Sequence, residues 1–147
     1  MSEASASLGP PPTIEQITSG MVVELRRSFS VQDLHAFEAL APDHAPLHRD
    51  PDFASQQGYR GIVVFGFLVA VPFSGILGDR LPGPLTVLHW ARFALAAPVY
   101  VGEEIVYRAT VKQVSRSTGA VVLELTATRV SSGEVVLRGQ AQCGFRL

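Results

Sequence analysis

Apolar and polar side chains alternate between Ala120 and Val130, a pattern that is typical of a strand with one buried face. Together with four further apolar segments, this gives five predicted strands: Met21–Phe29, Leu85–Leu95, Glu104–Ser115, Ala120–Val130 and Glu134–Phe145. Gly119 and Gly133 follow short runs of serine and threonine and are suited to tight hairpin turns. The last three strands are therefore predicted to be joined by hairpins.

Two short helices are predicted between the first and the second strand. Ser30 has the character of an N-cap, with the acid Asp33 three residues later, and this helix should end before Pro42. Asp50 is followed by proline, which favours a second helix that begins there and closes at Gly58.

Residues 61–78 contain no charged side chain and are long enough to be compared with a membrane span. Pro72 and the glycines at 66, 75 and 78 argue against a span, in a chain that is otherwise patterned for a sheet. The alternative is a helix that is buried on all sides by its own protein. We therefore predict an α+β fold in which an antiparallel sheet wraps around one central hydrophobic helix.

The composition supports one globular domain. A chain of 147 residues with 47% hydrophobic side chains can bury one sizeable core, which we assign to residues 14–147. Residues 1–13 are small, polar and rich in proline, and are expected to form a flexible arm and not a signal peptide. A net charge of -1 argues against a nucleic-acid partner, and one cysteine fits a reducing, cytoplasmic location.

A cluster of ionisable side chains lies between Asp43 and Asp50. It contains these two acids and the histidines His44 and His48. Pro46 disfavours a helix here, so we predict a turn in which Asp43 accepts a hydrogen bond from a backbone N–H two residues on. The four side chains could bind zinc or iron, Asp43 and His48 could act as an acid/base pair, or the segment could be a solvated turn. The residues alone leave these alternatives open.

The order of several short motifs resembles the MaoC-like (R)-specific enoyl-CoA hydratases and their dehydratase relatives, from about Met21 to Leu147. Asp43-His44-Ala45-Pro46-Leu47-His48 keeps the Asp, the Pro-Leu and the final His of the family's signature. Phe65-Gly66-Phe67-Leu68 occupies the position of its His-Gly-x-Leu motif. Its later landmarks are matched by Leu81-Pro82-Gly83, Phe93 and Pro98-Val99-x-x-Gly102-Glu103.

The resemblance implies a hot-dog fold and the reversible addition of water to a trans-2-enoyl thioester, which gives an (R)-3-hydroxyacyl thioester. It implies that Asp43 and His48 are catalytic and that the backbone N–H of Gly66 binds the thioester oxygen. Such a reaction needs one group to take a proton from water and one to protonate the α-carbon. No metal or other cofactor is expected, and the acyl group would be carried on coenzyme A or acyl carrier protein. The resemblance also implies a homodimer, with the active sites at the subunit interface.

Two departures from the family's pattern lie beside the expected site. Ala45 stands where the family has Asn, and Phe65 stands where it has His. Loss of these polar groups is expected to weaken or redirect activity. An acyl-thioesterase on the same fold and a non-catalytic acyl-binding or partner subunit remain alternatives.

Overall fold

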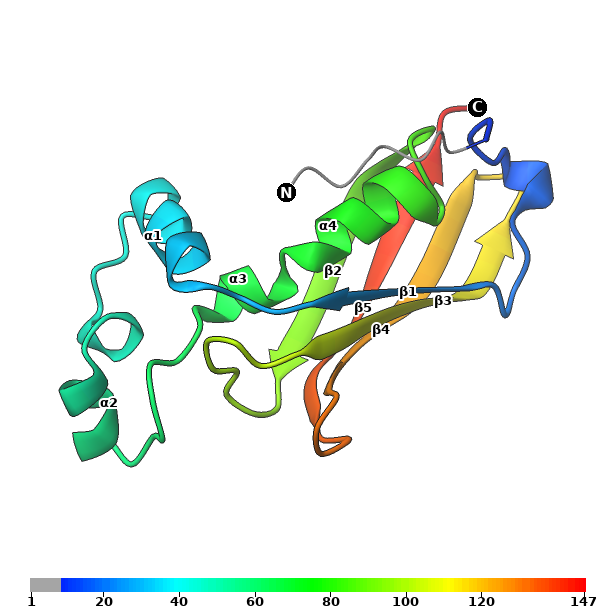
Figure 1. Ribbon diagram of the computed structural model, residues 1–147. Coiled ribbons are helices and arrows are strands. Elements are labelled where there is room, and N and C mark those ends of the chain that lie inside the picture. Colours follow the sequence, from blue (N-terminus) through cyan, green and yellow to red (C-terminus); the bar gives the residue numbers. More distant parts are fainter. Residues whose placement is uncertain (1–8) are drawn as a thin grey trace.

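The computed structural model describes residues 9–147. Five strands form one antiparallel sheet in the order β1-β3-β4-β5-β2 (Figure 1). The strands are β1 (Val22–Arg27), β2 (Thr86–Leu95), β3 (Ile105–Ser115), β4 (Ala120–Arg129) and β5 (Val135–Phe145). All five predicted strands are confirmed, and β3, β4 and β5 are joined by the predicted tight connections.

The central helix covers the later part of the apolar stretch and continues past its end to Arg80. It consists of α3 (Gly66–Ala70), α4 (Pro72–Gly75) and a π-helical turn, η3 (Ile76–Arg80). The residues before Gly66 are extended because Val63 forms an isolated antiparallel bridge with Tyr100, and the N–H of Val64 donates to the carbonyl of Val99 at 2.8 Å. The helix therefore begins five residues later than the uncharged run.

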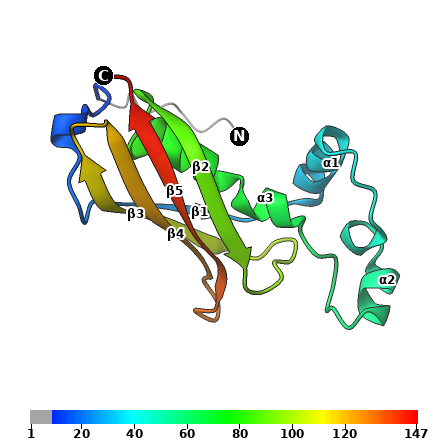
Figure 2. The same cartoon turned by 180° about the vertical axis from the view of Figure 1, so that it is seen from behind.

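The helical run lies across one face of the sheet, and the core lies between them (Figures 1 and 2). The rings of Phe73 and Tyr107 meet edge to face at 5.2 Å, and the hydroxyl of Tyr107 donates to the carbonyl of Val69 at 2.8 Å. This layer arrangement confirms the predicted α+β hot-dog fold. In the described residues, no helix is long and apolar enough to cross a membrane.

Helices α1 (Val31–Leu40) and α2 (Pro51–Gln56) lie beyond one end of the sheet (Figures 1 and 2). Both predicted caps are present. The hydroxyl of Ser30 accepts from the N–H of Asp33, whose carboxylate accepts from the N–H of Ser30 in return. Asp50 accepts from two N–H groups at the start of α2. A single-turn 3₁₀ helix, η2 (Pro46–His48), lies between α1 and α2.

The predicted N-terminal arm lies only partly in the described structure, because residues 1–8 are outside it. The first helical element of the described residues is a short 3₁₀ helix, η1 (Ile14–Gln16), and the N–H of its N-cap residue Thr13 donates to the side chain of Gln16 at 2.9 Å. Ile17 then inserts into the core and is 1% exposed.

Candidate active site

The turn between α1 and α2 has the predicted geometry. Oδ1 of Asp43 accepts a hydrogen bond from the N–H of Ala45 at 3.0 Å. The N–H of His48 donates to the carbonyl of Ala45 at 3.1 Å, and the N–H of Asp50 donates to that of Pro46 at 2.8 Å. The segment that carries both predicted catalytic side chains is therefore a hydrogen-bonded turn.

The imidazole of His48 is fixed from two directions. Its Nδ1 lies 2.6 Å from the carbonyl oxygen of Val63. Its ring stacks on that of Phe65, with the centroids 4.1 Å apart, and Phe65 also packs against Phe37 at 4.9 Å. Because a carbonyl oxygen can only accept, Nδ1 must carry a hydrogen, and Nε2 of the neutral ring has a free lone pair.

A cavity of about 310 Å³ adjoins this imidazole. His48 and Tyr59 are the residues with polar side chains in its lining, which is otherwise apolar. The remaining lining residues are Val63, Val64, Gly66, Val69, Leu95, Ala96, Ala97, Pro98 and Val99. A histidine that faces an apolar cavity of this size has the character of a small-molecule site.

Gly66 lies at the wall of the same cavity as the first residue of α3. Its N–H is one of those that a helix start leaves without an intrahelical acceptor. A Cβ atom at this position would lie 2.5 Å from Cδ1 of Leu95, so glycine lets strand β2 approach the helix closely. The structure therefore brings together His48 and Gly66, two of the three predicted site residues.

Asp43 lies at the other end of the turn, half-buried, and within residues 9–147 it is not part of the cavity lining. One of its oxygens is occupied by the N–H of Ala45. Within the described residues, the cavity therefore has His48 and Gly66 in its lining and Asp43 outside it.

The other polar side chains of the turn have separate partners. His44 and Arg49 both contact the carboxylate of Glu38 on α1, at 2.6 and 3.2 Å, and Asp50 caps α2. No three His, Cys, Asp or Glu side chains within residues 9–147 form a group that could hold a metal ion. The geometry gives no support to the alternative in which this segment binds zinc or iron.

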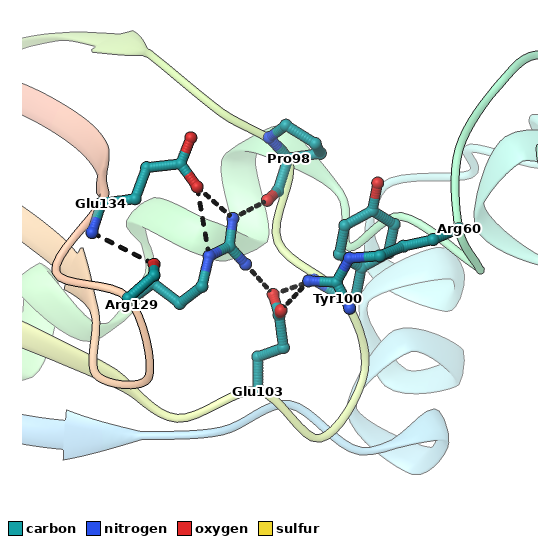
Figure 3. A network of polar contacts seen from close by, with 7 residues as sticks. Arg60, Pro98, Tyr100, Glu103, Arg129 and Glu134 are labelled. Carbon is teal, nitrogen blue, oxygen red and sulfur yellow. Dashed lines mark hydrogen bonds and ion pairs between the residues drawn. The ribbon is translucent and has the colours of Figure 1, made fainter.

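A network of charged side chains holds one wall of the cavity (Figure 3). The carboxylate of Glu103 bridges the guanidinium groups of Arg60 and Arg129, and it accepts from the N–H of Tyr100 at 3.0 Å. Arg129 is only 6% exposed and also donates to the carbonyl of Pro98 at 2.9 Å. The guanidinium of Arg60 lies over the ring of Tyr100, 4.0 Å from its centroid.

This network keeps Glu103 ionised. Burial tends to raise the pKa of its carboxyl group, but the hydrogen bonds from Tyr100, Arg60 and Arg129 outweigh burial and hold that pKa below its ordinary value. The sequence indicated Glu103 only as part of a family landmark. It gave no sign of Glu38 or of the Val63 carbonyl, because an acid on a helix and a backbone acceptor carry no recognisable pattern.

The chain is similar in sequence to a known family and to named proteins. Residues 14–133 match the family described as MaoC like domain. The chain is 30% identical over 127 residues to an (R)-specific enoyl-CoA hydratase of Rhodospirillum rubrum, covering 86% of this chain and 87% of that protein. It is 29% identical over 123 residues to a mitochondrial 3-hydroxyacyl-(acyl-carrier-protein) dehydratase of Solanum lycopersicum, covering 83% and 73%.

A solved structure agrees with these sequence matches. The (R)-hydratase from Aeromonas caviae involved in PHA biosynthesis superposes with a TM-score of 0.85 at 28% sequence identity, over 90% of this chain and 99% of that one. The turn, the helix start at Gly66 and the wall at Pro98 all lie inside the region that the family covers. The chain therefore belongs to the MaoC-like domain family, as its motifs predicted.

Proposed function

We propose that this protein adds water reversibly to trans-2-enoyl thioesters and forms (R)-3-hydroxyacyl thioesters. The observation that carries the proposal is the geometry of His48, whose Nδ1 is engaged by Val63 while its ring borders an apolar cavity beside Gly66. Hydratase and dehydratase relatives of similar sequence support the reaction class and its (R) stereochemistry.

His48 is the group placed to take a proton from water. Its neutral ring can only accept at Nε2, because Nδ1 already donates to Val63. In the hydration direction, the water oxygen bonds to the β-carbon as its proton passes to this base. A proton then passes to the α-carbon from the Asp43–His48 pair, which we treat as one coupled unit.

The N–H of Gly66 would stabilise the charge that develops on the thioester oxygen. That oxygen becomes enolate-like when water adds to the β-carbon, and a preorganised donor in an apolar site stabilises such a charge strongly. The position of Gly66 at the start of the helical run adds the favourable end of the helix dipole.

The reaction as proposed uses no cofactor. The acyl group arrives on a pantetheine arm, which coenzyme A and acyl carrier protein share, and relatives named for each carrier match this chain. A cytoplasmic location remains a prediction from the single cysteine.

The active form is proposed to be a homodimer that pairs along β2. This edge strand exposes apolar side chains, with Val87 at 69% and Leu95 at 48%, which is unusual for an edge that stays in water. Phe67 on α3 is 76% exposed and contacts Phe93 of β2 edge to face at 6.1 Å. A second copy would cover these exposed apolar side chains of β2 and α3.

The test is to follow loss of the enoyl-thioester absorbance with a short trans-2-enoyl-CoA, using Asp43→Asn as the control. Loss that disappears in Asp43→Asn supports both the reaction and the role of Asp43. Release of free thiol at the same rate would identify a thioesterase instead. No change with any enoyl thioester, on coenzyme A or acyl carrier protein, would indicate a binding or partner subunit.

A further inference from the structure

Glu38 on α1 contacts the residue that follows each member of the proposed catalytic pair. Its Oε1 lies 2.6 Å from Nδ1 of His44 and 3.2 Å from Nη1 of Arg49. His44 directly follows Asp43, and Arg49 directly follows His48. One carboxylate oxygen therefore joins the two ends of the segment that carries both catalytic side chains.

The two ends of this turn are anchored unequally to the rest of the molecule. The His48 end is held to the extended segment before α3, since the N–H of Val63 donates to the carbonyl of Leu47 at 3.2 Å and His48 itself donates to Val63. For Asp43, the hydrogen bond found in the described part of the chain is local, from the N–H of Ala45. Fixing the Asp43 end relative to His48 therefore falls to contacts such as those of Glu38.

The charge state of Glu38 suits this task. Its hydrogen bond with His44 and the nearby positive charge of Arg49 outweigh the effect of burial and hold the pKa of the Glu38 carboxyl below its ordinary value. The carboxylate is therefore ionised at neutral pH, and its side chain is only 19% exposed, compared with 66% for His44 and 54% for Arg49.

We propose that Glu38 is a positioning residue that sets the separation of Asp43 and His48 by holding both ends of their turn. The inference rests on the function proposed above for Asp43 and His48. Ion pairs whose partners are as exposed as His44 and Arg49 add little to stability. Catalysis is far more sensitive, because a displacement of about 1 Å in a reacting group can lower the rate by about 100-fold.

The kinetic test compares Glu38→Gln with Glu24→Gln. The control breaks the ion pair of Glu24 with Arg108 on strands β1 and β3, in which the arginine is 54% exposed, as Arg49 is, and the glutamate is 47% exposed. Glu38→Gln should lower kcat by about tenfold and leave KM within about twofold, whereas Glu24→Gln should change neither. His44→Gln should have a smaller effect on kcat, which disappears when it is combined with Glu38→Gln.

Amide hydrogen exchange tests the same proposal without reference to activity. The N–H groups of Ala45, His48, Arg49 and Asp50 all bond within the turn, and their protection should fall several-fold in Glu38→Gln but not in Glu24→Gln. Unchanged protection, or lower protection with an unchanged kcat, would overturn the positioning role. If the wild-type protein hydrates no enoyl thioester, the proposed function fails. The exchange experiment still has a result in that case, because unchanged protection in Glu38→Gln would show that Glu38 does not hold the turn.

Discussion

Nδ1 of His48 lies 2.6 Å from the carbonyl oxygen of Val63, and its imidazole stacks on the ring of Phe65, two residues later in the chain. One short extended segment thus supplies both the hydrogen-bond acceptor and the stacking surface for the proposed base. The tautomer of His48 is set by a backbone atom, which substitution of neighbouring side chains does not remove.

His48→Gln should lower kcat by at least about 100-fold, because glutamine can still donate to the Val63 carbonyl but has no basic nitrogen. The hydration rate with a short enoyl-CoA checks this, together with thermal unfolding to show that the fold is intact. His35→Gln, which changes an exposed histidine on α1, is the matched control. A variant at His48 that kept full activity would rule out its role as a base.

Gly66→Ala combined with Leu95→Ala separates two roles of the glycine. The single change Gly66→Ala should lower kcat/KM by about tenfold or more, because its methyl group meets Leu95 and enters the cavity. If Gly66 serves close approach of the substrate to the backbone, kcat/KM of the double variant should stay well below that of Leu95→Ala alone, although the clash is removed. Recovery of full activity would show that Gly66 serves helix packing alone.

Ala45→Asn should raise turnover on short enoyl-CoA substrates, on the order of several-fold, by returning a polar side chain to the turn. Because Ala45 is exposed, the melting temperature of the Ala45→Asn variant should equal that of the wild-type protein. Adding Phe65→His should raise turnover further but lower stability by about 1–3 kcal/mol, since Phe65 is 3% exposed and a buried polar group there lacks an assured partner. Equal turnover in all these variants would contradict the expectation.

Glu103→Gln should lower the free energy of unfolding by about 1–3 kcal/mol at pH 7, because it weakens charged hydrogen bonds to Arg60 and to buried Arg129. The folded state lowers the pKa of Glu103, so the carboxylate contributes stability above its ordinary pKa and loses it as pH falls through the lower folded value. Denaturant unfolding at pH 7 and at acidic pH should therefore show a shrinking difference from wild type. Glu104→Gln, which breaks an exposed pair with Arg26, should have little effect at either pH.

Val87→Lys should convert a dimer into a monomer, because it places a charge on the exposed apolar edge of β2. Light scattering coupled to size-exclusion chromatography measures the mass. Val22→Lys on β1, the opposite edge of the sheet, is the control and should leave the mass unchanged. A wild-type protein that is monomeric at micromolar concentration would rule out the proposed pairing.

The elements of the fold could be predicted because their signals are local. Alternation marked β4, the Ser30–Asp33 pair marked the start of α1, and Asp50 before proline marked α2. The turn at Asp43 followed from its side chain and Pro46, and its hydrogen bond to the N–H of Ala45 was predicted correctly. Each of these features depends on residues within a few positions of one another.

The tertiary structure alone decided which of these features meet. Val63 stops the central helix from starting earlier because it pairs with Tyr100, far along the chain, and its carbonyl then becomes available to His48. The strands, helices, caps and turn could be predicted, since these depend on local backbone preferences and short-range hydrogen bonds. Long-range packing, which local patterns do not encode, decides the rest. It brings the acceptor to His48, Gly66 to the cavity wall and Glu38 into contact with the turn.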